Sequence, residues 1–124
     1  MATEPRPAPG TILWRDLTVP DAGRLRDFYT HVVGWRAEEF EGDFNMFAPG
    51  SKEPVAGICH TAGPNRNLPA HWLIYITVDG LDDAVQRATA RGATLVDGPR
   101  KAGPGRIAVI RDPAGAYAAL SESK

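Results

Sequence analysis

The sequence predicts an α+β fold in which the order strand, helix and three strands occurs twice. Two observations carry this prediction. Apolar residues alternate in "ILWRDLTV" and again in "WLIYITV", as expected of strands with one buried face. Each of these strands is followed by a polar turn and a stretch with helical spacing of apolar residues, which ends at Gly34 or Gly92. The halves overlay at a spacing of about 59 residues, with Thr18 on Thr77, which indicates a duplicated unit.

The first half begins with a strand whose alternation places Leu13, Leu17 and Val19 on the helix side and Trp14, Asp16 and Thr18 on the other. Pro20 ends this strand, Asp21 can cap the next helix, and Gly34 can end it as a C′ glycine. The helix carries one apolar stripe, formed by Leu25, Phe28, Tyr29, Val32 and Val33. Strands are then expected at "RAEEF", "NMFA" and "VAGICH".

The second half follows a linker rich in Pro, Gly and Asn, "TAGPNRNLPA". In its first strand, the side chains expected to pack on the helix are Trp72, Ile74, Ile76 and Val78. The helix "DGLDDAVQRATARG" has an acidic first turn and a basic last turn with Arg87 and Arg91, which suits the helix dipole. Its apolar stripe is Leu81, Ala84, Val85 and Ala88. Strands are expected at "ATLVDG", "GRIAVIR" and "AYAALSE", and "GPRKAGPGR" is expected to be an exposed loop.

These elements define the expected domain organisation. Residues 1–10 are expected to form a flexible tail, residues 11–60 a first βαβββ module, residues 61–71 a linker and residues 72–124 a second module. The two modules together would make one domain over residues 11–122.

Composition narrows the function classes. The chain has 124 residues and a formal net charge of −1, which gives no electrostatic reason to bind nucleic acid or an anionic membrane. The longest apolar run, "WLIYI", is too short to cross a bilayer, and the start shows no signal peptide pattern. Cys59 is the only cysteine, which suits a reducing compartment. We therefore expect a cytoplasmic protein with no nucleic acid or membrane partner.

Three stretches together resemble the vicinal oxygen chelate superfamily, which includes glyoxalase I, extradiol dioxygenases and bleomycin resistance proteins. They are "DLTVPDAGRLRDFYTHVVGW", "DGLDDAVQRATARGATLVDGP" and "GRIAVIRDPAGAYAALSE". The resemblance implies two βαβββ modules whose strands form a cupped, mostly antiparallel eight-stranded sheet, with the helices outside. The cup of such proteins holds a small molecule and, in the enzymes, a divalent metal. Family members often form dimers, so a homodimer is an open expectation.

The resemblance also places the usual metal ligands on the first and last strands of each module. The four positions are Trp14, Gly57, Leu73 and Ala119. None of these side chains has the carboxylate or imidazole that a hard or borderline cation needs. The sequence therefore predicts no metal and no cofactor at these positions, and predicts that a chelating glutamate has been replaced at Ala119. An unusual site built from Asp16, Cys59 and His71 is the remaining alternative, without a close spacing motif to support it.

Aromatic and apolar side chains with a few polar points are expected to line the cup, as in many small-molecule sites. The predicted ligand contacts are Trp14, Asp16, Gly57, Cys59, Leu73, Tyr75, Tyr117 and Ala119. Asp16 is the candidate acid or base, unless it pairs with an arginine such as Arg106. Cys59 is a candidate nucleophile if a histidine lowers the pKa of its thiol, and otherwise a small buried residue.

Three functions stay open on this sequence. The first is metal-independent binding of a small organic molecule, with the aromatic residues stacking on a planar ligand and Asp16 as its polar anchor. The second is an enzyme, either using Asp16 in acid–base chemistry or acting as a glyoxalase-like lyase or dioxygenase with atypical ligands. The third is an assembly module whose cup is filled by side chains.

Overall fold

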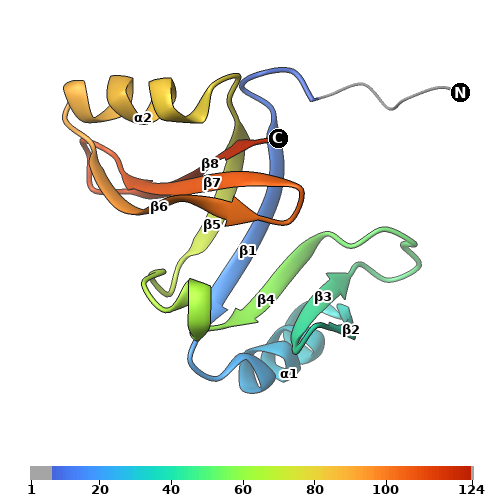
Figure 1. The fold of residues 1–124 in the computed structure, drawn as a ribbon. Coiled ribbons are helices and arrows are strands. Elements are labelled where there is room, and N and C mark those ends of the chain that lie inside the picture. The colour runs from blue at the N-terminus through green and yellow to red at the C-terminus, as the bar shows by residue number, and fades with distance from the viewer. Residues whose placement is uncertain (1–6, 124) are drawn as a thin grey trace, which may run out of the picture. The chain divides into compact units, whose positions relative to one another are not determined.

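The computed structural model describes residues 7–123, which contain two α-helices, one short 3-10 helix (Gly63–Asn65) and eight strands. The strands are hydrogen-bonded in the order β2-β3-β4-β1-β5-β8-β7-β6 (Figure 1). The chain divides into two compact units, residues 14–73 and residues 7–13 with 74–123. Of the expected flexible tail, residues 1–6 lie outside the described residues, whereas the Gly10 N–H donates a hydrogen bond to the Thr77 carbonyl.

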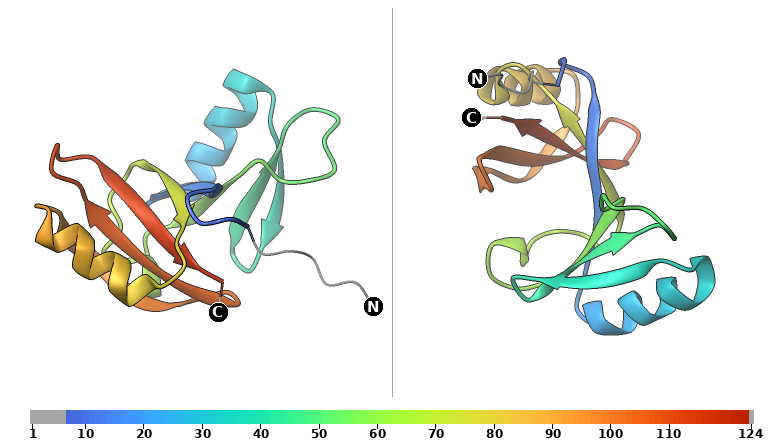
Figure 2. Two further views of the ribbon diagram at one scale, coloured as in Figure 1. Left: turned by 90° about the horizontal axis from the view of Figure 1, so that it is seen from above. Right: turned by 90° about the vertical axis from the view of Figure 1, so that its right-hand side faces the viewer.

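The first module consists of β1 (Ile12–Val19), α1 (Ala22–Val33), β2 (Arg36–Phe40), β3 (Asp43–Phe47) and β4 (Ala56–His60). β1 pairs with β4 in parallel, and the β2–β3 and β3–β4 pairs are antiparallel. α1 lies along these strands (Figure 2), and its predicted ends are confirmed. The Asp21 carboxylate accepts from the Arg24 N–H, and Gly34 ends the helix in the left-handed region.

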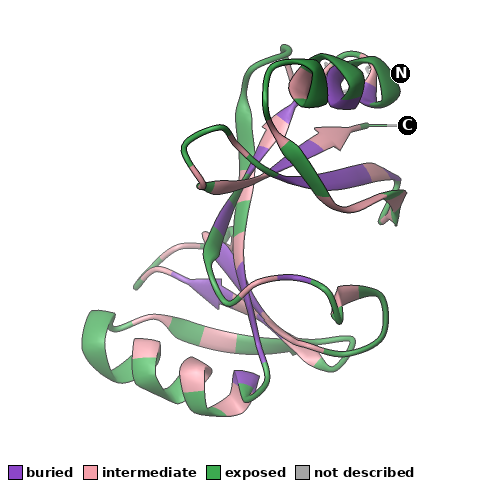
Figure 3. Cartoon of the chain, turned by 90° about the vertical axis from the view of Figure 1, so that its left-hand side faces the viewer, coloured by how far each residue is buried: buried purple, intermediate pink, exposed green. Residues whose placement is uncertain are grey.

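The core of this module lies between α1 and the sheet. Leu17 and Val19 of β1 and Ile58 of β4 are buried there, with Leu25 and Tyr29 of α1 packed against them. The predicted helix stripe is wrong in part, because Phe28, Val32 and Val33 are between 48% and 59% exposed. Leu13 is also exposed. The sheet therefore covers the stripe only in part, and most of α1 is exposed or half-buried (Figure 3).

The second module consists of β5 (Trp72–Thr77), α2 (Leu81–Ala90), β6 (Thr94–Ala102), β7 (Gly105–Arg111) and β8 (Tyr117–Glu122). β5 pairs with β8 in parallel, and the β6–β7 and β7–β8 pairs are antiparallel. Its core places the stripe of α2 against Ala108, Ile110 and Leu120, with Ile76 and Val78 packed at the edge.

Two expectations for this half are wrong. Trp72 does not pack on the second helix: its indole N–H donates to the Tyr29 hydroxyl at 3.0 Å, and its ring stacks edge-on against Tyr29 and Trp35. Ile74 is 38% exposed. The start of the predicted loop "GPRKAGPGR" is strand instead, because β6 continues to Ala102 through two register shifts between Leu95 and Arg100. Such bulges let a strand pass a proline that could not stay in a regular ladder.

Candidate functional site: the open face of the first module

Trp14, Asp16 and Gly57 share the face of the first module opposite its helix-side core. Asp16 lies opposite Gly57 in the β1–β4 ladder. A Cβ atom added to Gly57 would lie 3.3 Å from the Asp16 Cβ and 3.5 Å from Cζ2 of the Trp14 indole. The indole therefore occupies the space above Gly57 that a larger residue would take. Trp14 and Asp16 are each partly exposed, so this face carries an indole and a carboxylate.

Cys59 lies on the same face, in register with Thr18. Burial is the main cause that raises the pKa of its thiol from 9.0 to about 12, and the nearby carboxylates of Asp16 and Asp43 raise it further. The thiol is therefore protonated at neutral pH, and the environment opposes formation of the nucleophilic thiolate. These charges make Cys59 a small polar contact in the structure and a poor nucleophile.

Asp43 and Asn45 are polar residues of this module that the sequence prediction missed. Asn45 lies opposite Gly57 in the β3–β4 ladder, and the Asp43 carboxylate accepts from the backbone N–H of His60 at 2.9 Å and lies 3.2 Å from its ring Nδ1. The signal was present in "DFNMF", because Asp43 and Asn45 alternate with the buried Phe44 and Met46. The predicted strand began at Asn45, two residues too late, and so left out Asp43 and Phe44.

The other four predicted contacts lie at the β5–β8 pair or at its ends. Tyr75 lies opposite Ala119 in the parallel ladder, and Ala119 also lies opposite Val109 of β7. Leu73 and Ala119 are fully buried, Tyr75 is 9% exposed, and Tyr117 at the start of β8 is partly exposed. Leu120 is part of the helix-side core as expected, which leaves Ala119 on the opposite face.

The residues at the four positions that the resemblance implies for metal ligands do not fit a divalent metal. Trp14 and Leu73 place an indole and an isobutyl group there, and Gly57 and Ala119 place none of the oxygen or nitrogen atoms that such ions need. Over residues 7–123, no three His, Cys, Asp or Glu side chains are grouped so that they could hold a metal ion. The alternative site from Asp16, Cys59 and His71 is therefore not assembled in this structure.

The arginine and histidine residues considered in the sequence have other roles. Arg106 donates to Glu122 at 2.9 Å and to Asp82 at 2.9 Å, so these two carboxylates are its ion-pair partners. His31 is exposed in the last turn of α1, as expected. His71 is exposed just before β5, and its backbone N–H donates to the Pro69 carbonyl.

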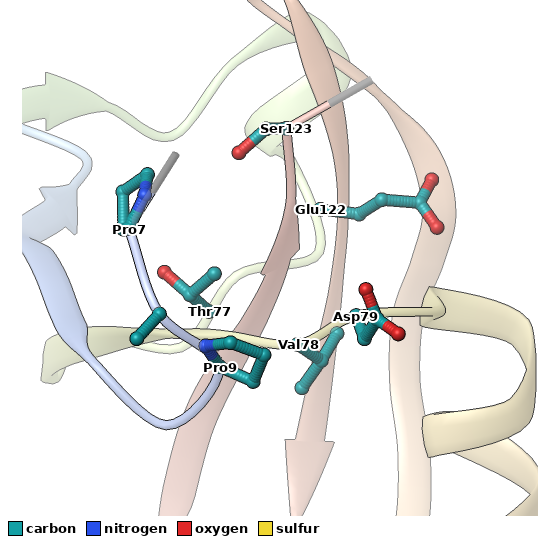
Figure 4. A pocket seen from close by; sticks show the side chains of 8 residues that line it. Pro7, Pro9, Thr77, Val78, Asp79, Glu122 and Ser123 are labelled. Atoms are coloured by element: carbon teal, nitrogen blue, oxygen red, sulfur yellow. The ribbon is translucent and has the colours of Figure 1, made fainter. Parts of the chain in front are cut away.

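Two hollows lie in the unit formed by residues 7–13 and 74–123, and none of the predicted ligand contacts lines them. One, of about 260 Å³, is bordered by Pro7, Pro9, Thr77 and Ser123, with the Asp79 and Glu122 side chains directed toward α2 (Figure 4). The Glu122 carboxylate there is already bound, because it accepts from the Leu81 N–H at 2.8 Å and pairs with Arg106. The second hollow is a groove of about 390 Å³ beside α2.

The sequence model of the Glyoxalase/Bleomycin resistance protein/Dioxygenase superfamily matches residues 11–120, so the chain belongs to this superfamily. Among curated relatives, the "Anthracycline biosynthesis protein DnrV" of Streptomyces peucetius is 33% identical over 129 aligned positions, which cover 91% of this chain and 47% of that protein. The "Putative glyoxylase CFP32" of Mycobacterium tuberculosis is 30% identical, with 86% and 42% covered. The chain thus spans about half the length of the curated relatives it matches.

Solved structures share the fold of this chain. A glyoxalase/bleomycin resistance protein/dioxygenase superfamily member from Vibrio splendidus superposes with a TM-score of 0.56 at 14% identity, covering 88% of this chain and 96% of that one. The methylmalonyl-CoA epimerase of Streptomyces coelicolor gives 0.52 at 15% identity, covering 94% and 99%. At these identities the likeness establishes the fold. In the described residues, no helix is long and apolar enough to span a membrane.

Proposed function

We propose that this chain binds a small planar organic molecule on the open face of the first module, without the help of a metal ion. The observation that carries the proposal is that the Trp14 indole and the Asp16 side chain both lie against Gly57, on one face of the module. An indole stacks on a flat conjugated ring of a ligand. A carboxylate at the edge of that ligand accepts a hydrogen bond from a hydroxyl group or forms an ion pair with an amine. Together the two groups would fix both the plane and the orientation of a ligand.

The names of the relatives support a planar ligand. Two of the curated relatives, at 33% and 31% identity, are described as anthracycline biosynthesis proteins, and an anthracycline has a fused planar ring system with hydroxyl groups. The protonated thiol of Cys59 adds a weak hydrogen-bond donor to the same face. Leu73, Tyr75, Tyr117 and Ala119 stay predicted contacts from the sequence.

The test is a titration with doxorubicin, an available anthracycline, followed by the fluorescence of the protein and by calorimetry. Trp14→Leu and Asp16→Asn should each weaken binding by about five- to tenfold, as expected for loss of one stacking or one charged contact. Asp83→Asn, which removes an exposed carboxylate in the first turn of α2, is the matched control and should bind like the wild type. Equal affinity in all four proteins would refute the proposed site.

The metal-independent part of the proposal has its own test. Protein purified without a metal-binding tag should contain less than stoichiometric Zn²⁺, Ni²⁺, Mn²⁺ or Fe²⁺. Adding any of these ions should leave the melting temperature unchanged, because a site-bound ion would raise it by mass action. Stoichiometric metal, or a large shift with one ion, would overturn this part and leave the ligand site to be tested separately.

A second candidate function is catalysis, which is favoured by the 30% identical relative described as a putative glyoxylase. The group available for such chemistry is Asp16, which lies close enough to Cys59 to raise the pKa of its thiol. In this case the protein should turn over a 2-oxoaldehyde in the presence of a thiol, and Asp16→Asn should abolish turnover. Activity that survives this substitution but is lost with a chelator would place the chemistry elsewhere.

The partner that the sequence leaves open is a second copy of the chain. Phe28, Val32 and Val33 give α1 an apolar outer surface that a homodimer would cover. Light scattering of the purified chain tests this. We expect a mass of twice 13.4 kDa for the wild type and the monomer mass for Val32→Glu. A monomeric wild type would exclude the homodimer.

A further inference from the structure

A groove of about 390 Å³ runs beside α2 in the second module and plays no part in the proposed function. Its floor consists of apolar side chains, and it is bordered by Arg87 of α2 and by Arg91, the residue that follows the helix. The lining residues are Val78, Ala84, Arg87, Ala88, Arg91, Ala93, Ile110, Asp112, Pro113 and Leu120. Its volume falls within the usual range for small-molecule sites, about 300–1,000 Å³.

The groove exists because α2 has small side chains where α1 has large ones. Ala22 and Leu81 are the first residues of their helices, so positions 59 apart correspond, as the sequence overlay predicts. On α1, Leu25 and Tyr29 pack against the core and fill the space between helix and sheet. The corresponding residues of α2 are Ala84 and Ala88.

The residues that follow the two helices also differ in size. Trp35, one residue after Gly34, packs against Tyr29 with ring centroids 5.6 Å apart, whereas Thr94 stands at the corresponding position in the second module. Leu81 replaces the smaller Ala22, so volume is restored at the N-terminal end of α2. The C-terminal half of the helix receives no such compensation, and the groove is bordered there by Ala93 and Pro113.

The border of the groove is positively charged. Arg87 and Arg91 are one helical turn apart on an exposed side of α2, where α1 has the apolar Phe28 and Val32. In the part of the chain that the structure describes, neither guanidinium has an ion-pair partner. The Asp112 carboxylate also borders the groove, but it accepts from the Ala114 and Ala116 N–H groups of its own turn. Two positive charges thus exceed one carboxylate and the partial negative charge of the helix end.

We propose that this groove binds an apolar carboxylate, with its hydrocarbon part against Ala84, Ala88 and Leu120 and its carboxylate between Arg87 and Arg91. Burying the hydrocarbon removes apolar surface of both partners from water. Two guanidiniums one turn apart match one carboxylate, which each can bind through paired N–H donors. A single small anion therefore satisfies both features of the groove, and this proposal stands independently of the one for the first module.

The test uses decanoate as the probe on the whole chain, with binding followed by the backbone amide signals in two-dimensional NMR spectra. Saturable changes should be confined to Val78 and to residues 84–93 and 110–120. Decylamine, which has the same chain and the opposite charge, should bind at least about fivefold more weakly. No saturable binding, changes that map to the first module, or equal binding of decylamine would overturn the proposal.

Two variants locate the site and guard against loss of folding. Ala88→Tyr introduces the residue that α1 has at this position, and should remove binding by filling the groove. The double change Arg87→Gln and Arg91→Gln keeps the groove open, and should weaken decanoate binding at least about fivefold while leaving decylamine binding no weaker. Arg24→Gln on α1 is the matched control. Unchanged decanoate affinity in the double variant would also refute the proposal.

Discussion

The two modules share a topology and differ in how they fill it. The first residues of the two helices are 59 positions apart. Each helix lies on the four strands of its module, which form one parallel and two antiparallel pairs. In the first module the space beneath the helix is filled by Leu25 and Tyr29, and excess apolar residues are left on the outer surface. In the second module, the outer side of the helix carries charged side chains, and Ala84 and Ala88 place small side chains toward the sheet. The two halves of the chain therefore repeat the helix register but not the side-chain volume.

The sheet face opposite the helices also differs between the two modules. The first module has Trp14, Asp16 and Cys59 on this face, all partly exposed. At the β5–β8 pair, Tyr75 and Ala119 are buried. Among the predicted ligand contacts, the partly exposed polar side chains are Asp16 and Cys59 in the first module and Tyr117 in the second. Only the first module combines a carboxylate with an indole on this face, which is why the proposed function is placed there.

The largest expected effect concerns pH and involves only the first module. The folded thiol of Cys59 has a pKa of about 12 against 9.0 for an ordinary thiol, so the unfolded chain binds fewer protons between these values. The stability that this group contributes is complete below pH 9 and is lost as the pH rises toward 12, by up to ~4 kcal/mol. Urea unfolding at pH 8 and pH 10.5 covers about half of this range, so the wild type should lose about 2 kcal/mol more than Cys59→Ala between these pH values. Parallel losses in both proteins would mean that the thiol is not so perturbed.

The next effect tests the filling of the first module. Tyr29→Ala should lower the free energy of unfolding by about 3 kcal/mol, because it removes a packed ring and the acceptor of the Trp72 N–H. Phe28→Ala is the matched control on the neighbouring, 52% exposed ring, and should cost less than about 1 kcal/mol. Similar losses from both substitutions, measured by urea denaturation, would contradict the burial difference described for α1.

A smaller effect distinguishes how the two helices begin. Asp21 caps α1 through its own side chain, whereas α2 follows Gly80 and receives its cap from Glu122, a residue of β8. Asp21→Ala and Glu122→Ala should each cost about 1 kcal/mol. Glu122→Ala should in addition expose the β8 end to hydrogen exchange, because the same carboxylate pairs with Arg106. Equal exchange at β8 in both variants would show that this cap is not shared between helix and strand.

The smallest effect is expected from partly filling the groove beside α2. Ala88→Leu should raise the free energy of unfolding by less than about 1 kcal/mol, since the groove is open and the added side chain stays partly hydrated. Thermal unfolding measures the change, and Ala90→Leu at the end of the same helix controls for helix propensity. A loss of more than about 1 kcal/mol would show that the helix already lies close to the sheet at this position.

The fold was predictable where the sequence pattern reports on neighbours along the chain. Alternation in β1 and β5, the cap at Asp21 and the left-handed Gly34 all act locally, and the helix register followed from them. The strand continuing past Pro99 was not predictable, because it depends on register shifts against β7. The packing of Trp72 on Tyr29 joins residues 43 positions apart, and no periodicity within either segment indicates it.

The candidate site was predictable to the same extent. Alternation correctly separated Gly57 and Asp16 from the core residues Ile58 and Leu17. It could not show that the Trp14 indole lies over Gly57, since that is a contact between two strands. Nor could it give the protonation state of Cys59, which depends on burial and on the Asp43 carboxylate of a third strand.

The distribution of tryptophan has a practical consequence. Trp14, Trp35 and Trp72 all belong to the unit formed by residues 14–73, and the other unit has none. Tryptophan emission therefore reports the melting of one unit alone, while circular dichroism in the peptide region reports both. Comparing the two signals during denaturation would measure whether the halves of this chain unfold in one cooperative transition or in two. The chain thus contains its own optical label for half of its structure.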